Sequence, residues 1–134
     1  MSSQKIAVLS PDAPAPSNLM SQAVICNGMI YCSGSRGIDP KTGKFVDGNA
    51  SDRTMSDTGV QALRNLENTL KKGGSHLSQV VKVNNFVSSM EYYGQVNEGY
   101  GQIFTQGVKP CRTCVAVASL PLDAEVEIEC IASV

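Results

Sequence analysis

Two short segments near the C-terminus, PCRTCVAVA at residues 110–118 and EVEIECIA at residues 125–132, decide which fold this chain is predicted to adopt. Each is predicted to be a strand, in which successive side chains point to opposite faces. Leu120-Pro121 breaks the apolar run between them. A linker of about six residues suits neighbouring strands, so the two segments predict an antiparallel hairpin.

The charged residues of these two segments fall on defined faces. Arg112 shares a face with Cys114 in the first segment, whereas Glu125, Glu127 and Glu129 share one face of the second. An Arg fork suits a planar carboxylate ligand, and a Glu can hold a water or move a proton. The hairpin could therefore bring Arg112 near a carboxylate in a site for a small acid. An exposed face on which Arg and Glu pair weakly is the alternative that the spacing alone favours.

Length and composition indicate one folded domain. The chain has 134 residues, 42% of them hydrophobic and 17% charged, which predicts a single domain over residues 1–134, with an N-terminal strand and loop in residues 1–18. The net charge of -1 argues against a nucleic-acid partner. No apolar run reaches the ~18–20 residues that span a bilayer. Since no secretory signal or Arg-rich leader is visible, we expect a cytoplasmic protein, with a mitochondrial location left open.

The five cysteines lie in apolar, strand-like segments, and this predicts reduced, buried thiols in an intracellular protein. Cys111 and Cys114 have the spacing of a redox motif, but such a motif normally opens a helix, whereas this pair lies in a predicted strand. The chain has one histidine, His76, and no second Cys-x-x-Cys pair. The sequence therefore predicts no metal site.

The N-terminal part of the chain predicts three further strands. Residues 5–9 form a short first strand, and residues 10–18 form a loop because they contain three prolines. Asn27-Gly28 separates the apolar runs 21–26 and 29–33. Both turn residues tolerate the positive φ that a type I′ turn requires, which predicts a tight hairpin.

A helix is predicted between residue 51 and the stop signal at Gly73-Gly74. Asp52, Thr54 and Ser56 are its candidate N-cap residues. Small and apolar residues recur through it at three- and four-residue spacing, which is typical of an amphipathic helix on a sheet. The residues of this stripe are Met55, Gly59, Ala62, Leu63, Leu66 and Leu70.

Residues 79–87 predict the next strand, with Val81, Val83 and Val87 as candidates for burial, and residues 91–105 predict a second helix. The resulting order of hairpin, helix, strand, helix and hairpin predicts an α+β fold, with two helices packed on one face of a mixed sheet. The opposite face stays partly apolar. We therefore expect the chain to associate with copies of itself.

These segments together resemble the RidA (YjgF) family of reactive-intermediate deaminases, over residues 13–132. No single motif is specific, but their combination is. The segments that carry the resemblance are 21–34 (SQAVICNGMIYCSG), 39–43 (DPKTG), 81–87 (VKVNNFV), Val96-Asn97 with Tyr100 and Phe104, and the C-terminal pattern Pro110-x-Arg112-x-Cys114-Val115-x-Val117, Leu120-Pro121, Val126-Glu127-Ile128-Glu129.

The resemblance implies a chorismate-mutase-like fold and a homotrimer whose active sites lie in clefts between subunits. Members of the family hydrolyse enamines and imines of 2-oxo acids, such as 2-aminoacrylate and 2-iminobutanoate, to the oxo acid and ammonia. They use no metal and no organic cofactor. The expected partners of this chain are therefore a small imino acid and further copies of itself.

The resemblance also implies roles for individual residues. Arg112 matches the arginine that grips the substrate carboxylate, and Glu127 matches the glutamate that orients the attacking water. The remaining matched residues line the substrate pocket: Cys114 through its backbone, Ser33 and Gly34 as a wall, and Asn97 at the edge. For so reactive a substrate, fixing the orientation supplies a large part of the catalysis.

Two departures from the family pattern fall on the same pocket wall. Asn18-Leu19-Met20 stands where the family has Gly-Pro-Tyr, and Ser35 stands where it has Gln. Met20 makes the pocket more apolar and removes a hydroxyl, which favours a changed and bulkier substrate. The alternatives are a non-catalytic protein that binds small carboxylates or acts by protein contact, and a pathway-specific enzyme for one imine. A nuclease is less favoured, because neither a basic patch nor a histidine pair is present.

Overall fold

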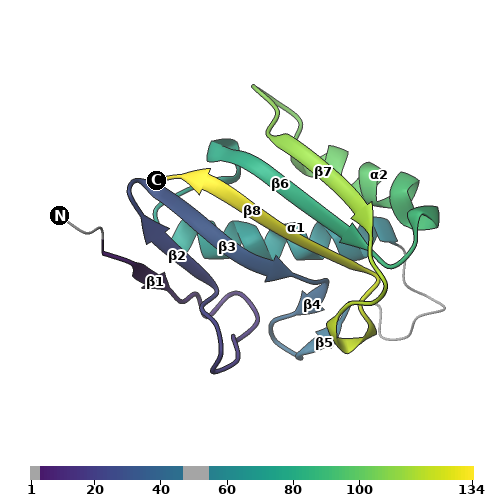
Figure 1. The fold of residues 1–134 in the computed structure, drawn as a ribbon, viewed down its shortest axis with the longest axis horizontal. Helices are drawn as coiled ribbons and strands as arrows, with labels where there is room; N and C mark the ends of the chain where they lie inside the picture. The colour runs from purple at the N-terminus through teal and green to yellow at the C-terminus, as the bar shows by residue number, and fades with distance from the viewer. Residues whose placement is uncertain (1–3, 47–54) are drawn as a thin grey trace.

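The computed structural model describes residues 4–46 and 55–134. Within them, two helices cover one face of a six-stranded mixed sheet (Figure 1), which confirms the predicted α+β class. The strands are β1 Ile6–Val8, β2 Ala23–Cys26, β3 Met29–Ser35, β6 Val80–Val87, β7 Cys111–Ala116 and β8 Val126–Ser133, with β4 Ile38–Asp39 and β5 Lys44–Phe45 forming a small second sheet; the helices are α1 Met55–Lys72 and α2 Tyr93–Ile103, and the 3-10 turns are η1 Leu77–Gln79, η2 Met90–Tyr92 and η3 Pro121–Asp123.

The strand order β1-β2-β3-β8-β6-β7 shows that the predicted C-terminal hairpin is wrong. β7 and β8 are not neighbours, because β6 lies between them, antiparallel to β8 and parallel to β7. One face of β8, with Val126, Ile128 and Ala132, is fully buried, so this strand takes a central position. β7 is an edge strand, and the turn η3, with positive φ at Leu122 and Asp123, leads from it towards β8.

The β2–β3 hairpin and α1 confirm the predictions for the N-terminal half. Asn27 and Gly28 have φ of 53° and 75°, as a type I′ turn requires, and β2 pairs antiparallel with β3 around them. Leu63 and Leu70 of the α1 stripe are among the most buried residues of the core. The helix ends at Lys72, one residue before Gly73. The proposed N-caps Asp52 and Thr54 lie outside the described residues, and Ser56 lies within the helix.

β6 departs from its predicted burial pattern. Val83 and Val87 are fully buried as expected, but Val81 is 45% exposed. The register shifts between Val80 and Lys82, so Val80 takes the buried place instead. Asn85, which lies between the two buried valines on the same face, is also fully buried and becomes important below.

The thiols fit the expectation of buried cysteines only in part. All five cysteines are free, and Cys32 and Cys130 are buried opposite each other on β3 and β8. Cys26 and Cys114 are half-buried, and Cys111 at the start of β7 is exposed. Cys111 and Cys114 both lie in β7, as predicted, and not at the start of a helix.

The face of the sheet that carries no helix is partly apolar, as predicted. Tyr31 on β3 and Val115 on β7 are exposed, and Phe86 and Ile131 are half-buried between them. The residues of β6 and β8 that alternate with these point into the helix-covered core. In the described part of the chain, neither helix combines the length and apolar character needed to cross a membrane.

Candidate active site

Arg112 lies on β7 and points to the helix-covered side of the sheet, where four side chains fix it. Its Nε donates a hydrogen bond to Asn85 Oδ1 at 3.0 Å, and its Nη1 donates one to Asn97 Oδ1 at 2.6 Å. The guanidinium carbon lies 4.2 Å from the ring centre of Tyr100 and 5.8 Å from that of Tyr93. Two hydrogen bonds and two aromatic faces together leave the fork little freedom to turn.

One end of this fork has no hydrogen-bond partner in the described part of the chain. Arg112 Nη2, Asn85 Nδ2 and Tyr100 Oη are buried and have no hydrogen-bond partner among the described residues. Buried donors without partners are unfavourable, and such groups recur where a protein binds a ligand. A small carboxylate supplies the acceptor oxygens that these groups lack.

Cys114 and Asn97 both lie beside Arg112, as the predicted pocket requires. Asn97 projects from α2 and contacts Arg112 directly. Cys114 follows Arg112 by two residues on β7, so both point to the same face. Burial raises the pKa of the Cys114 thiol, and the Arg112 cation lowers it only in part. The protonated thiol fits a pocket-lining residue better than a nucleophile.

Glu127 on β8 lies on the opposite, helix-free face of the sheet. Its Oε1 is 3.6 Å from Arg36 Nη1, which forms an ion pair. Gly34 lies against the same side chain, because a Cβ added there would stand 2.7 Å from Glu127 Cδ. Burial raises the pKa of Glu127; Arg36 lowers it and Glu129 raises it by lesser amounts. The carboxyl group can thus bind and release a proton closer to neutral pH than an exposed glutamate does.

The structure does not bring Arg112 and Glu127 together within one chain. They lie on β7 and β8, which β6 separates, and they point to opposite faces of the sheet. The expectation that a hairpin places them side by side is therefore wrong. Its physical reason is that β6 pairs in parallel with β7, so that Val83 and not a residue of β8 lies opposite Arg112.

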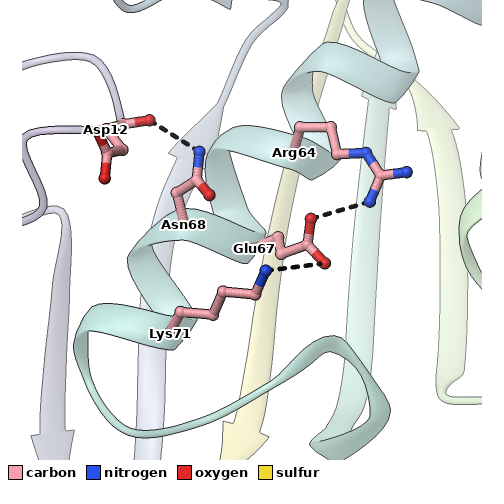
Figure 2. Close-up of polar contacts among 5 residues, drawn as sticks. All are labelled: Asp12, Arg64, Glu67, Asn68 and Lys71. Atoms are coloured by element: carbon pink, nitrogen blue, oxygen red, sulfur yellow. Dashed lines mark hydrogen bonds and ion pairs between the residues drawn. The ribbon is translucent and has the colours of Figure 1, made fainter.

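Met20, Ser33 and Gly34 line one cavity of about 490 Å³ at the end of β3. The proline-rich loop forms one wall of it, and Arg36 and part of α1 form another. The loop is tied to α1 because Asn68 Nδ2 donates a hydrogen bond to Asp12 O at 2.9 Å. Figure 2 shows this contact beside Glu67, which pairs with Arg64 and Lys71 on the same helix.

Four residues of the site were not among the predicted ones, namely Tyr93, Tyr100, Asn85 and Arg36. Tyr100 carries part of the family resemblance but has no predicted role, although its ring lies against the Arg112 guanidinium. Asn85 interrupts a run of buried valines, and a polar residue at a buried strand position is a signal that the sequence does contain. Arg36 has no such signal, since it lies just beyond β3 in a turn-like segment. Among residues 4–46 and 55–134, no cluster of three or more His, Cys, Asp or Glu side chains could hold a metal ion.

Comparisons with curated proteins identify relatives along nearly the whole chain. A family model described as endoribonuclease L-PSP matches residues 10–134. A RutC family protein of Aquifex aeolicus is 37% identical over 93% of this chain and 96% of its own length. Reactive Intermediate Deaminase A of Arabidopsis thaliana is 38% identical over 97% of this chain and 66% of its own length. The 2-iminobutanoate/2-iminopropanoate deaminase of Rattus norvegicus is 39% identical over 90% of this chain and 83% of its own length.

Solved structures agree with these relatives. Yeast Mmf1 superposes with a TM-score of 0.89 at 35% identity, covering 97% of this chain and 98% of that one. The E. coli YjgF gene product gives a TM-score of 0.87 at 30% identity, covering 96% and 98%. E. coli TdcF, solved with bound serine, gives a TM-score of 0.87 at 27% identity, covering 96% of this chain and 98% of that one. Sequence and fold therefore agree: this chain belongs to the RidA/YjgF (L-PSP, RutC) family.

Proposed function

We propose that this protein hydrolyses reactive imines and enamines of 2-oxo acids to the oxo acid and ammonia. The observation that carries the proposal is the environment of the Arg112 guanidinium. Asn85 and Asn97 accept hydrogen bonds from it, the rings of Tyr93 and Tyr100 lie against it, and its Nη2 has no partner in the described part of the chain. A guanidinium fixed in this way suits the carboxylate of a 2-imino acid. Relatives whose names are those of deaminases of such compounds support the assignment.

We further propose that each active site forms between two copies of the chain in a homotrimer. Arg112 and Glu127 point to opposite faces of one sheet, so a small substrate cannot touch both in a single chain. The exposed Tyr31 and Val115 on the helix-free face offer apolar area for such an association. Arg112 of one copy then faces Glu127 of the next.

The proposed reaction needs only a held substrate and a held water. An enamine such as 2-aminoacrylate first gains a proton on its methylene carbon and loses one from its nitrogen, and so becomes the neutral imine. Glu127 positions a water whose oxygen bonds to the imine carbon, while one water proton passes to the nitrogen. The hydroxyl proton of this adduct then moves to the nitrogen, the carbon–nitrogen bond breaks, and ammonia leaves the oxo acid.

The name of the matching family model, endoribonuclease L-PSP, suggests ribonuclease activity as a second candidate function. Two features of the chain favour the deaminase over that function. His76 is its one histidine, so it cannot supply a pair of histidines for general acid and base catalysis on RNA. Its net charge of -1 offers little electrostatic attraction for a polyanion.

A coupled assay tests the proposed function. An amino-acid dehydratase generates 2-aminoacrylate from serine or 2-iminobutanoate from threonine, and the loss of the imine is followed spectroscopically. We expect the wild-type protein to accelerate this loss and Arg112→Ala not to. Arg64→Ala is the matched control, since Arg64 lies on the surface of α1 and pairs only with Glu67 in the described structure. If the wild type leaves the rate unchanged, the deaminase function is wrong.

A further inference from the structure

The cavity beside Ser33 and Gly34 is larger than the smallest imino acids require. Its volume of about 490 Å³ falls within the ~300–1,000 Å³ of pockets that enclose drug-sized ligands. 2-Aminoacrylate carries only a methylene group beyond its reacting carbon, and such a group leaves most of this cavity unfilled. The space therefore suits a substrate with a larger side chain.

Apolar side chains form part of the buried wall of the cavity, beside the buried polar residues Gln22, Asn65 and Thr69. Leu66 of α1 is 3% exposed and Ile38 of β4 is 6% exposed, and both line it. Pro14 and Pro16 of the N-terminal loop and the half-exposed Met20 also line the cavity. Apolar surface of this kind gains free energy when an apolar group replaces water against it.

Apart from the guanidinium of Arg36, whose Nε is buried without a partner among the described residues, the polar side chains in the lining already form hydrogen bonds within the protein. Serine, threonine and amide groups there bond to backbone or to neighbouring side chains, so they offer little to a polar ligand. These contacts are Leu19 N to Ser17 Oγ, Gln22 Nε2 to Ser10 O and Pro14 O, Ser33 Oγ to Ser21 O, Ser35 Oγ to Ala62 O, Asn65 Nδ2 to Ile38 O, Gln61 Nε2 to Asn65 Oδ1, and Thr69 Oγ1 to Asn65 O.

The charged side chain in the lining belongs to Arg36, and its ion pair with Glu127 favours an apolar substrate side chain over an acidic one. Its Nη1 already pairs with Glu127 at 3.6 Å, which offsets the guanidinium charge before a ligand arrives, whereas its buried Nε has no hydrogen-bond partner among the described residues. An acidic side chain entering the cavity would compete with Glu127 for this cation. An apolar side chain leaves the ion pair, and with it the charge of Glu127, undisturbed.

We propose that the preferred substrate is the imine of a 2-oxo acid with a bulky apolar side chain, leucine-like or phenylalanine-like, which lies in this cavity. The inference rests on the proposed deaminase function. Gly34 and Arg36 line the cavity and also contact Glu127. A side chain in the cavity thus places the imine carbon next to the carboxylate that holds the water.

The test compares imines that an amino-acid oxidase generates from alanine, leucine, phenylalanine and glutamate. We expect kcat/KM for the leucine or phenylalanine imine to exceed that for the alanine imine by at least about tenfold, because each methylene in an apolar pocket contributes about that factor or more. An alanine or glutamate imine that reacts equally fast or faster overturns the inference while leaving the deaminase function intact.

A binding measurement separates the inference from the function on which it rests. Chemical-shift titration with the product oxo acids needs no turnover: 4-methyl-2-oxopentanoate is expected to bind at least about tenfold more tightly than pyruvate. Equal affinities overturn the inference. If tight binding of the larger oxo acid is seen with a protein that hydrolyses no imine, the cavity assignment holds and the deaminase function fails.

A variant that narrows the cavity provides an independent check. Ala15 lies in the exposed loop that lines the cavity, so Ala15→Trp adds bulk there without touching the core. We expect it to lower the leucine-to-alanine ratio of kcat/KM by about tenfold. Ala7→Trp is the matched control, because Ala7 is exposed on β1 and does not line the cavity. An unchanged ratio in Ala15→Trp, with the larger oxo acid still bound, contradicts the assignment of the side chain to this cavity.

Discussion

Asn85 Oδ1 accepts a hydrogen bond from Arg112 Nε at 3.0 Å, and this contact is made by a side chain that is fully buried in the sheet. The Nδ2 of the same amide has no partner in the described part of the chain. A buried amide that is only half satisfied destabilises a core. The presence of Asn85 at this buried position is explained if its side chain holds the Arg112 guanidinium in the orientation that a carboxylate ligand requires.

Replacing Asn85 with leucine tests this explanation. We expect Asn85→Leu to raise KM and lower kcat/KM by tenfold or more, since a hydrogen bond to a charged group contributes about 1.5–3 kcal/mol. The thermal unfolding midpoint should change little, because removal of the unpaired Nδ2 offsets the loss of the acceptor for Arg112 Nε. Steady-state kinetics and calorimetry measure the two effects. A large fall in the midpoint with unchanged kinetics would show that Asn85 serves the fold alone.

The proposed role of Glu127 in holding the water predicts that its ionised form sets the pH dependence of the reaction. Burial raises the pKa of Glu127 above the ordinary value for a glutamate, and Arg36 works against that rise. Activity is therefore expected to be full above this raised pKa and to fall as the pH drops through it. Arg36→Met removes the cation, so the acid limb of the kcat/KM profile should move to higher pH.

Arg64→Met is the control for the pH profile, because Arg64 lies on the surface of α1 and pairs with Glu67. The acid limb of the kcat/KM profile of Arg64→Met should coincide with that of the wild type. Direct titration of the Glu127 carboxyl carbon by NMR, which needs no turnover, should show the same displacement in Arg36→Met. An acid limb that stays in place or moves to lower pH would contradict the role of Arg36.

Gly34 provides a steric test of the position of Glu127. A Cβ at residue 34 would stand 2.7 Å from Glu127 Cδ and 3.0 Å from Cγ, so Gly34→Ala must displace this side chain. We expect kcat to fall by about tenfold or more, since small misplacements of a catalytic group have effects of this size. Gly101→Ala is the control: its added Cβ meets no atom within 4 Å, and in a helix it should stabilise the fold by about 0.5–1 kcal/mol.

Met20→Tyr introduces the hydroxyl that the resemblance to the family predicts at this position. Met20 is 48% exposed, so the free energy of unfolding should change by less than about 0.5 kcal/mol. In the cavity the added hydroxyl brings a polar group that needs a hydrogen-bond partner. We expect the preference for leucine-derived over alanine-derived imines to decrease, measured as the ratio of kcat/KM. A ratio that increases would mean that Met20 is not what makes the cavity apolar.

The fold was predictable from sequence where local rules decide it. Asn27-Gly28 specifies its turn by backbone geometry, and the stripe through Leu63 and Leu70 specifies the buried face of α1. The neighbour of β7 was not predictable in this way. Alternation shows which side chains of a strand share a face, but the strand that pairs beside it depends on contacts distant in sequence. Here α2 connects β6 to β7 as a parallel pair, in place of the expected hairpin.

The site was predictable in its residues but not in its geometry. The resemblance to the family selected Arg112 and Glu127, and the structure shows both in polar surroundings that suit the proposed roles. It could not show that they point away from each other within one chain. Asn85 and Arg36 orient or pair with them, and neither belongs to a motif. Their parts follow only from the packing of β6 and the end of β3.

Mixing two inactive variants tests most directly whether Arg112 and Glu127 of different copies share one site. Arg112→Ala and Glu127→Gln are each expected to be inactive alone. After unfolding and refolding together in equal amounts, random assembly should leave both intact residues in about one quarter of the sites of a ring. The proposal thus predicts recovery of about one quarter of wild-type activity in the mixture. No recovery, from variants that form mixed oligomers by mass spectrometry, would contradict it.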